Sequence, residues 1–520
     1  MIIETYHETQ SKISADDLLS GLVAHGMFNE KLPPIFCGVE FLDYCQSIQH
    51  TFKEMPSQYV EYENTRNINV PRVLAIPNPF SYYLQCKNIK DNWPKILEHF
   101  KKNTCNHEYK VSRIHIRNIG DEREKIFDMY ADGVDEEIVA SNYIFCMSYK
   151  NYKNDGSPES KLAIKSRYLV RADISNCFPS IYTHAIPWAI VGKKIAKNNQ
   201  NNNEWFNALD LSTRNLKEAE THGVLIGPHS SNIISEIILT TIDKALYDKG
   251  YRYLRYIDDY ECYLESYEEA ERFLVELSAV LKVYGLALNH RKTEIIKMPI
   301  TSSTHWVRAL NNTKFLDKEE INFKDLQGFL DTALELMSKH NENSAILNYA
   351  IKAISKKNLT GNAKDYLIDV IHHLVLLYPY LVTILHDVVF QNISLKSNRI
   401  AEIANDLFDL GITRDNFEVM SYALFFALQY EFKLEVESVF EEVKEKDDAV
   451  LLLIAYLHDK KFINHSAVTN KYKRLAESKL DELDRYWVFV YEVLGSNKFK
   501  DDWRALKRKD ISFVKQKYRW

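Results

Sequence analysis

The chain has 520 residues, of which 46% are hydrophobic, and only 15 glycines and 13 prolines. At about 100–200 residues per domain, this length predicts roughly two to four folded domains, and the composition excludes a collagenous, low-complexity or largely disordered chain. The net charge of −6 argues against a protein that coats nucleic acid by bulk charge. Any contact with nucleic acid must therefore use local patches.

The cysteine content and the hydropathy of the chain indicate the cellular compartment in which the protein resides. Seven cysteines are scattered without CxxC spacing, which indicates neither a disulfide framework nor a zinc site. The N-terminus lacks the basic and apolar regions of a signal peptide, and no run of about 18 or more apolar residues occurs. We therefore expect a soluble protein of the reducing cytoplasm, with no membrane partner.

The first half of the chain carries the strand signals. A strand is expected over residues 112–117, with Arg113 and Arg117 on one face, and a second strand over 168–174, which contains Asp173 near its end. Further strands over 251–256 and 260–264 would be joined by a turn at Ile257, Asp258 and Asp259.

The carboxylates of these elements suggest a metal site. Neighbouring strand residues point to opposite faces, so Asp258 and Asp259 can face one point only if the turn redirects them. If Asp173 lies on a neighbouring strand of the same sheet, Asp173 and Asp258 could hold two divalent ions about 4 Å apart. Magnesium prefers such oxygen ligands. The alternative is that each Asp caps backbone N–H groups at a turn.

After about residue 310 the chain changes to long amphipathic stretches with few breakers, which predicts stacked helix pairs or an ordinary helical bundle. The last 26 residues hold nine Lys and Arg against three Asp, a pattern that fits either phosphate contact or a solvated helix face. The expected helical segments are Ala345–Ile354, Tyr366–Leu377, Ile400–Leu410, Phe417–Leu428, Ala449–Leu457 and Tyr486–Leu494.

Four motifs occur in the order typical of one polymerase family. Residues 173–178 (DISNCF) resemble motif A of reverse transcriptases, 223–232 (GVLIGPHSSN) motif B, 256–259 (YIDD) the YxDD box of motif C, and Leu288-Asn289 with Lys292-Thr293 motif D. The sequences of residues 179–184 (PSIYTH) and 226–228 (IGP) are similar to the corresponding segments of the bacterial abortive-infection and defence-associated reverse transcriptases of the unknown group. The similarity spans roughly residues 20–310.

The resemblance implies an α+β right-hand polymerase. Fingers and a split βαβ palm would occupy residues 1–310, and an all-α, HEAT-like helical-repeat domain would occupy 311–520 in the place of a thumb. One departure is Ile226, which stands where many reverse transcriptases have Gln, and this puts retroviral-style template handling in doubt.

The resemblance also assigns residue roles, with Mg²⁺ or Mn²⁺ as the cofactor. Phe178 would act as the steric gate that favours deoxynucleotides, and Lys292 would protonate the pyrophosphate leaving group or offset its charge. The alternatives are that Phe178 packs beneath the sheet and that Lys292 is merely solvated. The full set comprises the catalytic residues Asp173, Asp258, Asp259 and Lys292, the metal ligands Asp173, Ile174, Asp258 and Asp259, and the dNTP-binding residues Phe178, Arg113, Arg117, Gly227 and Tyr256.

The function implied is an antiphage defence reverse transcriptase that adds dNTPs by two-metal nucleotidyl transfer. Synthesis would be protein-primed, and either untemplated or templated by a partner non-coding RNA, with single-stranded DNA as product and a trimer or hexamer as the assembly. The sequence does not identify a priming residue. Two alternatives are a catalytically silent RNA-binding scaffold with a polymerase fold and a retroelement enzyme that copies templates in the ordinary way.

Overall fold

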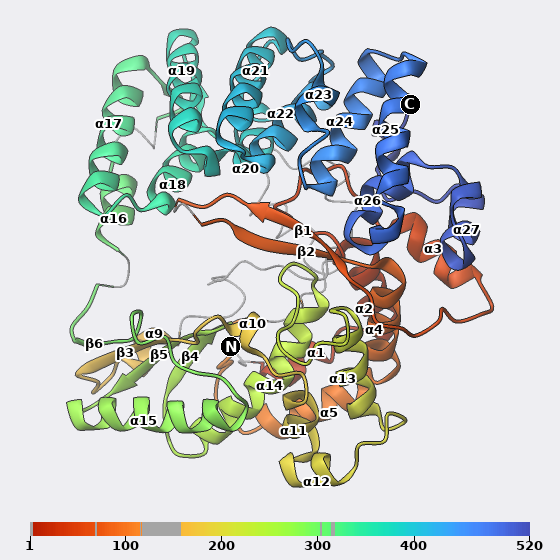
Figure 1. Ribbon diagram of the computed structural model, residues 1–520. Helices are drawn as coiled ribbons and strands as arrows, with labels where there is room; N and C mark the ends of the chain where they lie inside the picture. The colour runs from red at the N-terminus through yellow and green to blue at the C-terminus, as the bar shows by residue number, and fades with distance from the viewer. Residues whose placement is uncertain (1–3, 68–69, 115, 117–157, 302–303, 314–317) are drawn as a thin grey trace.

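The computed structural model describes residues 4–67, 70–114, 116, 158–301, 304–313 and 318–520. The four-stranded sheet and its helices form the lower part of the molecule in Figure 1, and the C-terminal helices stand in a row at the top. The hairpin β1–β2 lies between these two parts.

The central sheet has the strand order β4-β5-β3-β6, and every neighbouring pair is antiparallel. Because β3 and β4 both run against β5, which lies between them, they share one direction, and the chain crosses from β3 to β4 through helices, as in a split βαβ unit. The strands are β3 (Tyr168–Asp173), β4 (Tyr253–Tyr256), β5 (Asp259–Leu264) and β6 (Glu294–Lys297). The strands predicted at 168–174, 251–256 and 260–264 are therefore confirmed, with boundaries shifted by one or two residues.

Helix α14 (Ser230–Tyr247) is buried over most of its length and packs on α5 (Trp93–Thr104), α11 (Ala185–Val191) and α15 (Tyr267–Val283). It begins within motif B, with Ser230 and Ser231 as its first two residues. Both serines lie inside the helix, and His229 occupies the cap position without a side-chain cap hydrogen bond.

The N-terminal region surrounds the hairpin of β1 (Tyr59–Asn64) and β2 (Arg72–Pro77), which pair antiparallel. Asn78 caps the following helix by accepting hydrogen bonds from the N–H groups of Phe80 and Ser81. The other helices of the first 310 residues are α1 (Tyr6–Gln10), α2 (Ala15–Ser20), η1 (Gly21–His25), α3 (Val39–Ser47), α4 (Pro79–Asp91), α9 (Glu159–Leu162), α10 (Cys177–Ser180), α12 (Lys193–Asn198), α13 (Trp205–Asn215) and α16 (His305–Asn311).

The C-terminal region is largely helical, and each of the six predicted segments falls mainly within a helix. Its only strands in the described residues are the short parallel pair β7 (Glu320–Ile321) and β8 (Asn358–Leu359). Along the row, α17 contacts α19, α19 contacts α21, and α21, α22, α24 and α26 follow in contact. The helices are α17 (Phe323–Lys339), α18 (Ser344–Ile354), α19 (Gly361–Leu377), η3 (Pro379–Leu381), α20 (Val382–Ile384), η4 (Leu385–Phe390), α21 (Ser397–Arg414), α22 (Phe417–Tyr430), α23 (Val439–Val443), α24 (Ala449–Phe462), α25 (Ser466–Ser478), η5 (Leu480–Glu482), α26 (Leu483–Val493), η6 (Ser496–Lys498), α27 (Asp501–Arg508) and η7 (Gln516–Tyr518).

A buried carboxylate, Glu418, and a partly buried one, Asp484, join the segments around the β1–β2 hairpin to this helical row. Glu418, at the start of α22, accepts hydrogen bonds from Thr65 N at 2.7 Å and from Asn64 Nδ2 at 2.8 Å. Asp484, in α26, accepts from Gln58 N at 3.1 Å and from Asn78 Nδ2 at 2.7 Å. These contacts fix the hairpin against the helices.

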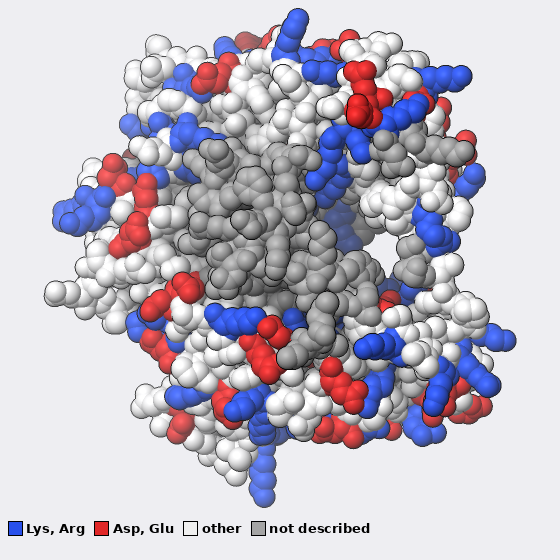
Figure 2. Space-filling model, turned by 180° about the vertical axis from the view of Figure 1, so that it is seen from behind, with Lys and Arg blue, Asp and Glu red and all other residues white. Residues whose placement is uncertain are grey.

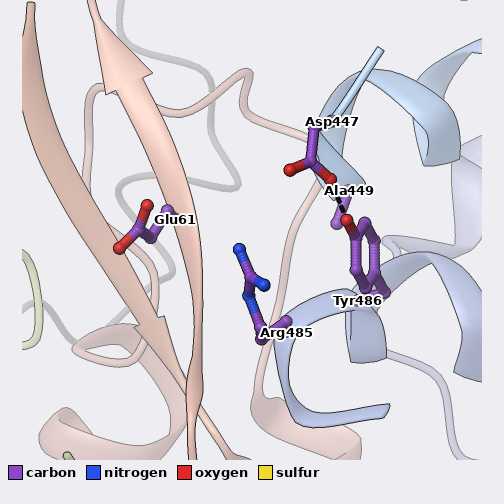
Figure 3. Close-up of a pocket in the computed structure, with 5 residues that line it drawn as sticks. All are labelled: Glu61, Asp447, Ala449, Arg485 and Tyr486. Atoms are coloured by element: carbon purple, nitrogen blue, oxygen red, sulfur yellow. Dashed lines mark hydrogen bonds between the residues drawn. The ribbon is translucent and has the colours of Figure 1, made fainter. Parts of the chain in front are cut away.

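A small polar hollow lies along the same seam, between β1 and the helices α24 and α26 (Figure 3). The Arg485 guanidinium lies between Glu61 and Asp447, and Tyr486 donates a hydrogen bond to Asp447. With Ala449, these residues form the lining.

The basic C-terminal segment docks on the N-terminal region. Phe513 and Val514 are buried, and Lys515 N donates to Ile35 O at 2.8 Å. Arg519 Nη2 lies 2.9 Å from Glu40 Oε1. The segment is therefore not simply a solvated helix face, because its apolar residues belong to the core.

Two further expectations concern membranes and thiols. Among the helices described, none combines the length and the apolar character needed to cross a membrane. The six cysteines within the described residues carry free thiols.

Candidate active site

Asp173 is the last residue of β3 and lies two residues beyond Arg171, which pairs with Glu294, the first residue of β6. The loop that precedes β6 holds Asp173 in place. Asn289 makes two hydrogen bonds with it: Asn289 Nδ2 donates to Asp173 Oδ1 at 2.8 Å, and Asn289 N donates to Asp173 O at 2.8 Å. Lys292 Nζ donates to Asp173 Oδ2 at 2.9 Å. This hydrogen bond raises the pKa of Lys292, whose side chain is otherwise 66% exposed. Motifs A and D thus meet at one carboxylate.

Asp258 lies in the tight turn between β4 and β5, as predicted, whereas Asp259 is the first residue of β5. Ile257 adopts a left-handed backbone with φ of 56°, which turns the chain directly before Asp258. Asp258 O accepts a hydrogen bond from Ile174 N at 3.0 Å, so the turn is fastened to the end of β3. The β3–β5 register places Asp259 opposite Asp173.

The two turn carboxyl groups carry perturbed acidities. Burial raises the pKa of Asp258, and the negative charge of Asp173 raises it further. Burial raises the pKa of Asp259 to about 6, with Asp258, Asp173 and a side-chain hydrogen bond to Asp173 acting in the same direction. Carboxylates that repel one another in this way are favourable neighbours for a cation.

The chemistry of this donor set fits a divalent metal ion, because carboxylate oxygens are the ligands that Mg²⁺ prefers. Ile174 could contribute only its backbone carbonyl. Within the described residues, however, no group of three or more His, Cys, Asp or Glu side chains lies close enough together to hold a metal ion. Instead, the Lys292 ammonium supplies the positive charge next to Asp173.

Motif B folds against motif A and against the β1–β2 hairpin. Val224 N donates to Phe178 O at 2.9 Å, and Phe178 itself is partly buried against the core. Gly227 has φ of +129°, and a Cβ there would lie 2.9 Å from the Ala75 carbonyl oxygen. Ala75 N in turn donates to Ile226 O at 2.8 Å. The glycine is therefore required by the close approach of β2, whatever else binds there.

Arg113 and Tyr256 meet at Glu159 of α9. Arg113 Nη2 lies 3.4 Å from Glu159 Oε1, and Tyr256 Oη donates to the same oxygen at 3.3 Å. A strand was predicted over residues 112–117. Residues 112–114 do not form one, because they carry only an isolated bridge between Ser112 and Arg255. Arg113 is buried rather than projecting from a strand face. Arg117 lies outside the described residues.

Three residues of this region were not singled out from the sequence. Asn289 was part of motif D but was given no role, although it makes two hydrogen bonds with Asp173. Glu159 stands apart from every motif, so no sequence signal pointed to it. Arg255 directly precedes the YIDD box and is fully buried. A buried charge needs a partner, and only the fold reveals which one.

Residues 140–324 match the family model described as reverse transcriptase (RNA-dependent DNA polymerase). The matched segment contains motifs A to D together with the central sheet. This region thus has the sequence of a reverse transcriptase domain, a domain with a polymerase fold.

No curated protein matches the chain. Solved structures similar to it include an apo telomerase from Candida tropicalis truncated of its C-terminal domain, with 14% identity over 51% of this chain and 54% of that chain, at a TM-score of 0.30. The apo telomerase of the same organism (11% identity, 75% of this chain, 68% of that chain, TM-score 0.28) is another. A third is a telomerase from Candida albicans in complex with a fragment of telomeric RNA (11% identity, 75% of this chain, 63% of that chain, TM-score 0.24). The chain spans about half the length of the first of these.

Proposed function

We propose that this chain is a metal-dependent DNA polymerase that adds deoxynucleotides to a 3′ or protein hydroxyl. The observation that carries the proposal is the meeting of motifs A, C and D at one end of the sheet. There Asp173 contacts Asn289 and Lys292, and Asp259 lies opposite it across the β3–β5 pairing. Enzymes of this class use divalent metal ions, and Mg²⁺ is proposed here, with Mn²⁺ as a substitute.

The metal ions would be held by Asp173, the Ile174 carbonyl, Asp258 and Asp259. When bound, they would supply Lewis-acid stabilisation of the phosphoryl group during in-line displacement. Lys292, already beside Asp173, would protonate or neutralise the pyrophosphate leaving group.

The remaining proposed residues select and orient the nucleotide. Phe178 would exclude a ribose 2′-hydroxyl, and Gly227 would allow the backbone of motif B to approach the nucleotide. Tyr256 would complete the nucleotide site next to the turn. Arg113 and Arg117 remain proposals for triphosphate binding, and Arg113 would first have to leave Glu159.

The cellular role proposed is antiphage defence in the bacterial cytoplasm, and it is supported by the resemblance of motifs A and B to defence-associated reverse transcriptases. Protein priming, untemplated synthesis or copying of a non-coding RNA, a single-stranded DNA product and a trimeric or hexameric assembly are proposed on the same basis. The helical region from residue 311 would act as a HEAT-like repeat in the place of a thumb. Its row of consecutive helix contacts is consistent with this role.

Surface charge bears on how a nucleic acid would be held. Figure 2 shows charges of both signs interspersed over one face of the molecule, with Lys and Arg side chains bordering a hollow between its upper and lower parts. This distribution favours local phosphate contacts rather than binding along a uniformly basic face.

The test is to incubate the purified chain with labelled dNTPs and Mg²⁺, without primer or template, and to run the products on a denaturing gel before and after protease treatment. Label that migrates with the protein and is released by protease would support protein-primed synthesis. The base composition of the product would separate random addition from copying of a co-purified RNA. The matched control, Asp258→Ala with Asp259→Ala, should abolish the label, and synthesis retained by that variant would refute the proposal.

A catalytically silent RNA-binding scaffold is the second candidate. It is favoured by the absence, among the described residues, of a gathered three-carboxylate cluster and by the Lys292 ammonium on Asp173. Absence of saturable Mn²⁺ binding, together with absence of label even when total bacterial RNA is added, would support the scaffold over the polymerase.

A further inference from the structure

Arg255, in β4, directly precedes the YIDD box, and its guanidinium is fully buried. Two carboxylates of α14 surround it. Nε and Nη2 donate to Asp243, the shortest contact being 2.7 Å from Nη2 to Oδ2. Nη1 and Nη2 donate to Glu236 at 2.7 and 3.1 Å. Because Glu236 and Asp243 are seven residues apart on α14, both face the same side of the helix.

One donor of Arg255 leaves this cluster and reaches the turn. Nη1 donates to Ile257 O at 2.9 Å, which is the carbonyl of the peptide that joins Ile257 to Asp258. Ile257 has a φ of 56°, a conformation that is costly for a β-branched residue and persists only where its surroundings hold it. The contact therefore holds the strained residue Ile257, which directly precedes Asp258.

The geometry explains why an arginine stands here. The planar fork of a guanidinium can bind two carboxylates and a carbonyl at once, whereas a lysine ammonium has three donors at a single point. On the other side of the turn, Asp258 O accepts from Ile174 N. The turn is thus fixed from α14 through Arg255 and from β3 through Ile174.

We propose that Arg255 is a positioning residue: it transmits the rigid placement of α14 to the Ile257–Asp258 peptide and so sets the direction of the Asp258 carboxylate. The relevance to catalysis rests on the polymerase function proposed above, but the clamp itself is a property of the turn. Arg255 touches neither substrate nor metal in this role.

The test compares Arg255→Lys with Asp243→Asn in the full chain. Arg255→Lys keeps the buried positive charge but cannot keep all the fork contacts. Asp243→Asn weakens the cluster and leaves the Nη1 contact to Ile257 in place. Hydrogen exchange of the peptide covering residues 256–260 should speed up about tenfold or more in Arg255→Lys, as expected for loss of a buried charge-assisted hydrogen bond, and by less than threefold in Asp243→Asn.

A catalytic readout accompanies the exchange measurement. The Mg²⁺ concentration that gives half-maximal DNA synthesis should rise about tenfold in Arg255→Lys with little change in the KM for dNTP, because the metal ligand and not the nucleotide site is displaced. Adding Ile257→Gly to Arg255→Lys should bring this Mg²⁺ concentration most of the way back to that of the unaltered chain, since glycine adopts a positive φ without being held.

The proposal is overturned if both variants accelerate exchange in proportion to their loss of thermal stability. It is also overturned if Arg255→Lys folds and hydrogen exchange of residues 256–260 is unchanged. Should Arg255→Lys fail to fold, Ile257→Gly alone decides. A turn clamped by Arg255 stays protected in that variant, and a tenfold rise in exchange contradicts the clamp. If the unaltered chain makes no DNA and binds no metal, the polymerase proposal fails while the exchange data still judge the clamp.

Discussion

Asp448→Asn should stabilise this protein at neutral and alkaline pH and leave its stability almost unchanged near pH 4. Asp448 is the N-cap of α24, where Oδ1 accepts from Leu451 N at 2.7 Å, and only 3% of the residue is exposed. Burial, with the charges of Glu63 and Asp447 acting in the same direction, raises the pKa of Asp448 from 3.8 to about 7. Asn serves as an N-cap about as well as Asp, so the substitution removes the charge and retains the cap.

The direction and size follow from linkage. A carboxyl group whose pKa is higher in the folded state favours folding fully below pH 3.8, and that contribution is lost as the pH rises through about 7. The difference between these two pKa values corresponds to about 4 kcal/mol, which is an upper bound for the gain. The gain of Asp448→Asn should therefore grow between about pH 4 and pH 7 and stay constant above that range.

Thermal unfolding of the purified protein at pH 4.5 and pH 8 measures this effect. For a chain of this length, the gain corresponds to a rise in Tm of roughly 5 °C at pH 8 and about 1 °C at pH 4.5. Asp409→Asn, at an exposed position of α21, is the matched control and should change neither value by more than about 1 °C. A loss of Tm at pH 8, or an equal gain at both pH values, would refute the buried-charge reasoning.

Three further outcomes are expected. Glu418→Ala should lower the free energy of unfolding by about 2–4 kcal/mol in urea titrations, because it leaves part-buried donors of the β1–β2 hairpin without their acceptor, whereas Glu418→Gln should lower it less. Gly227→Ala should cost about 1–3 kcal/mol more than Gly250→Ala by the same measurement, since both have positive φ but only Gly227 meets a backbone oxygen at 2.9 Å. If Phe178 is the steric gate, Phe178→Ala should raise incorporation of ribonucleotides relative to deoxynucleotides about tenfold or more in labelled-nucleotide assays, and unchanged discrimination would argue for a packing role.

Local pattern was sufficient for the elements around the site. Runs of apolar and β-forming residues predicted β3, β4 and β5, and they placed Asp258 in the turn that joins β4 and β5. The 3.6-residue period predicted the helices of the second half. These signals depend only on neighbours in the chain, so they survive without knowledge of the fold.

Contacts between distant segments were decided by the tertiary structure alone. The basic C-terminal segment has the composition of a solvated or phosphate-binding tail, yet Phe513 and Val514 complete the core beside residues 35–37. Arg113 was expected to project from a strand face, and instead it is buried and pairs with Glu159. In both cases the deciding factor is burial against a partner far away in sequence, which no local pattern records.

The candidate site shows the same division. The sequence by itself determined which residues form motifs A to D and their order along the chain, because spacing and residue type are properties of the chain. Only the tertiary structure decided that Asp173 is held by Asn289 and Lys292, and that Asp259 lies opposite it on the adjacent strand. It also decided that Arg255 joins the turn to α14. Hydrogen bonds and charge pairs act over a few ångströms, so their partners are set by how the strands and helices come together and not by separation in the sequence.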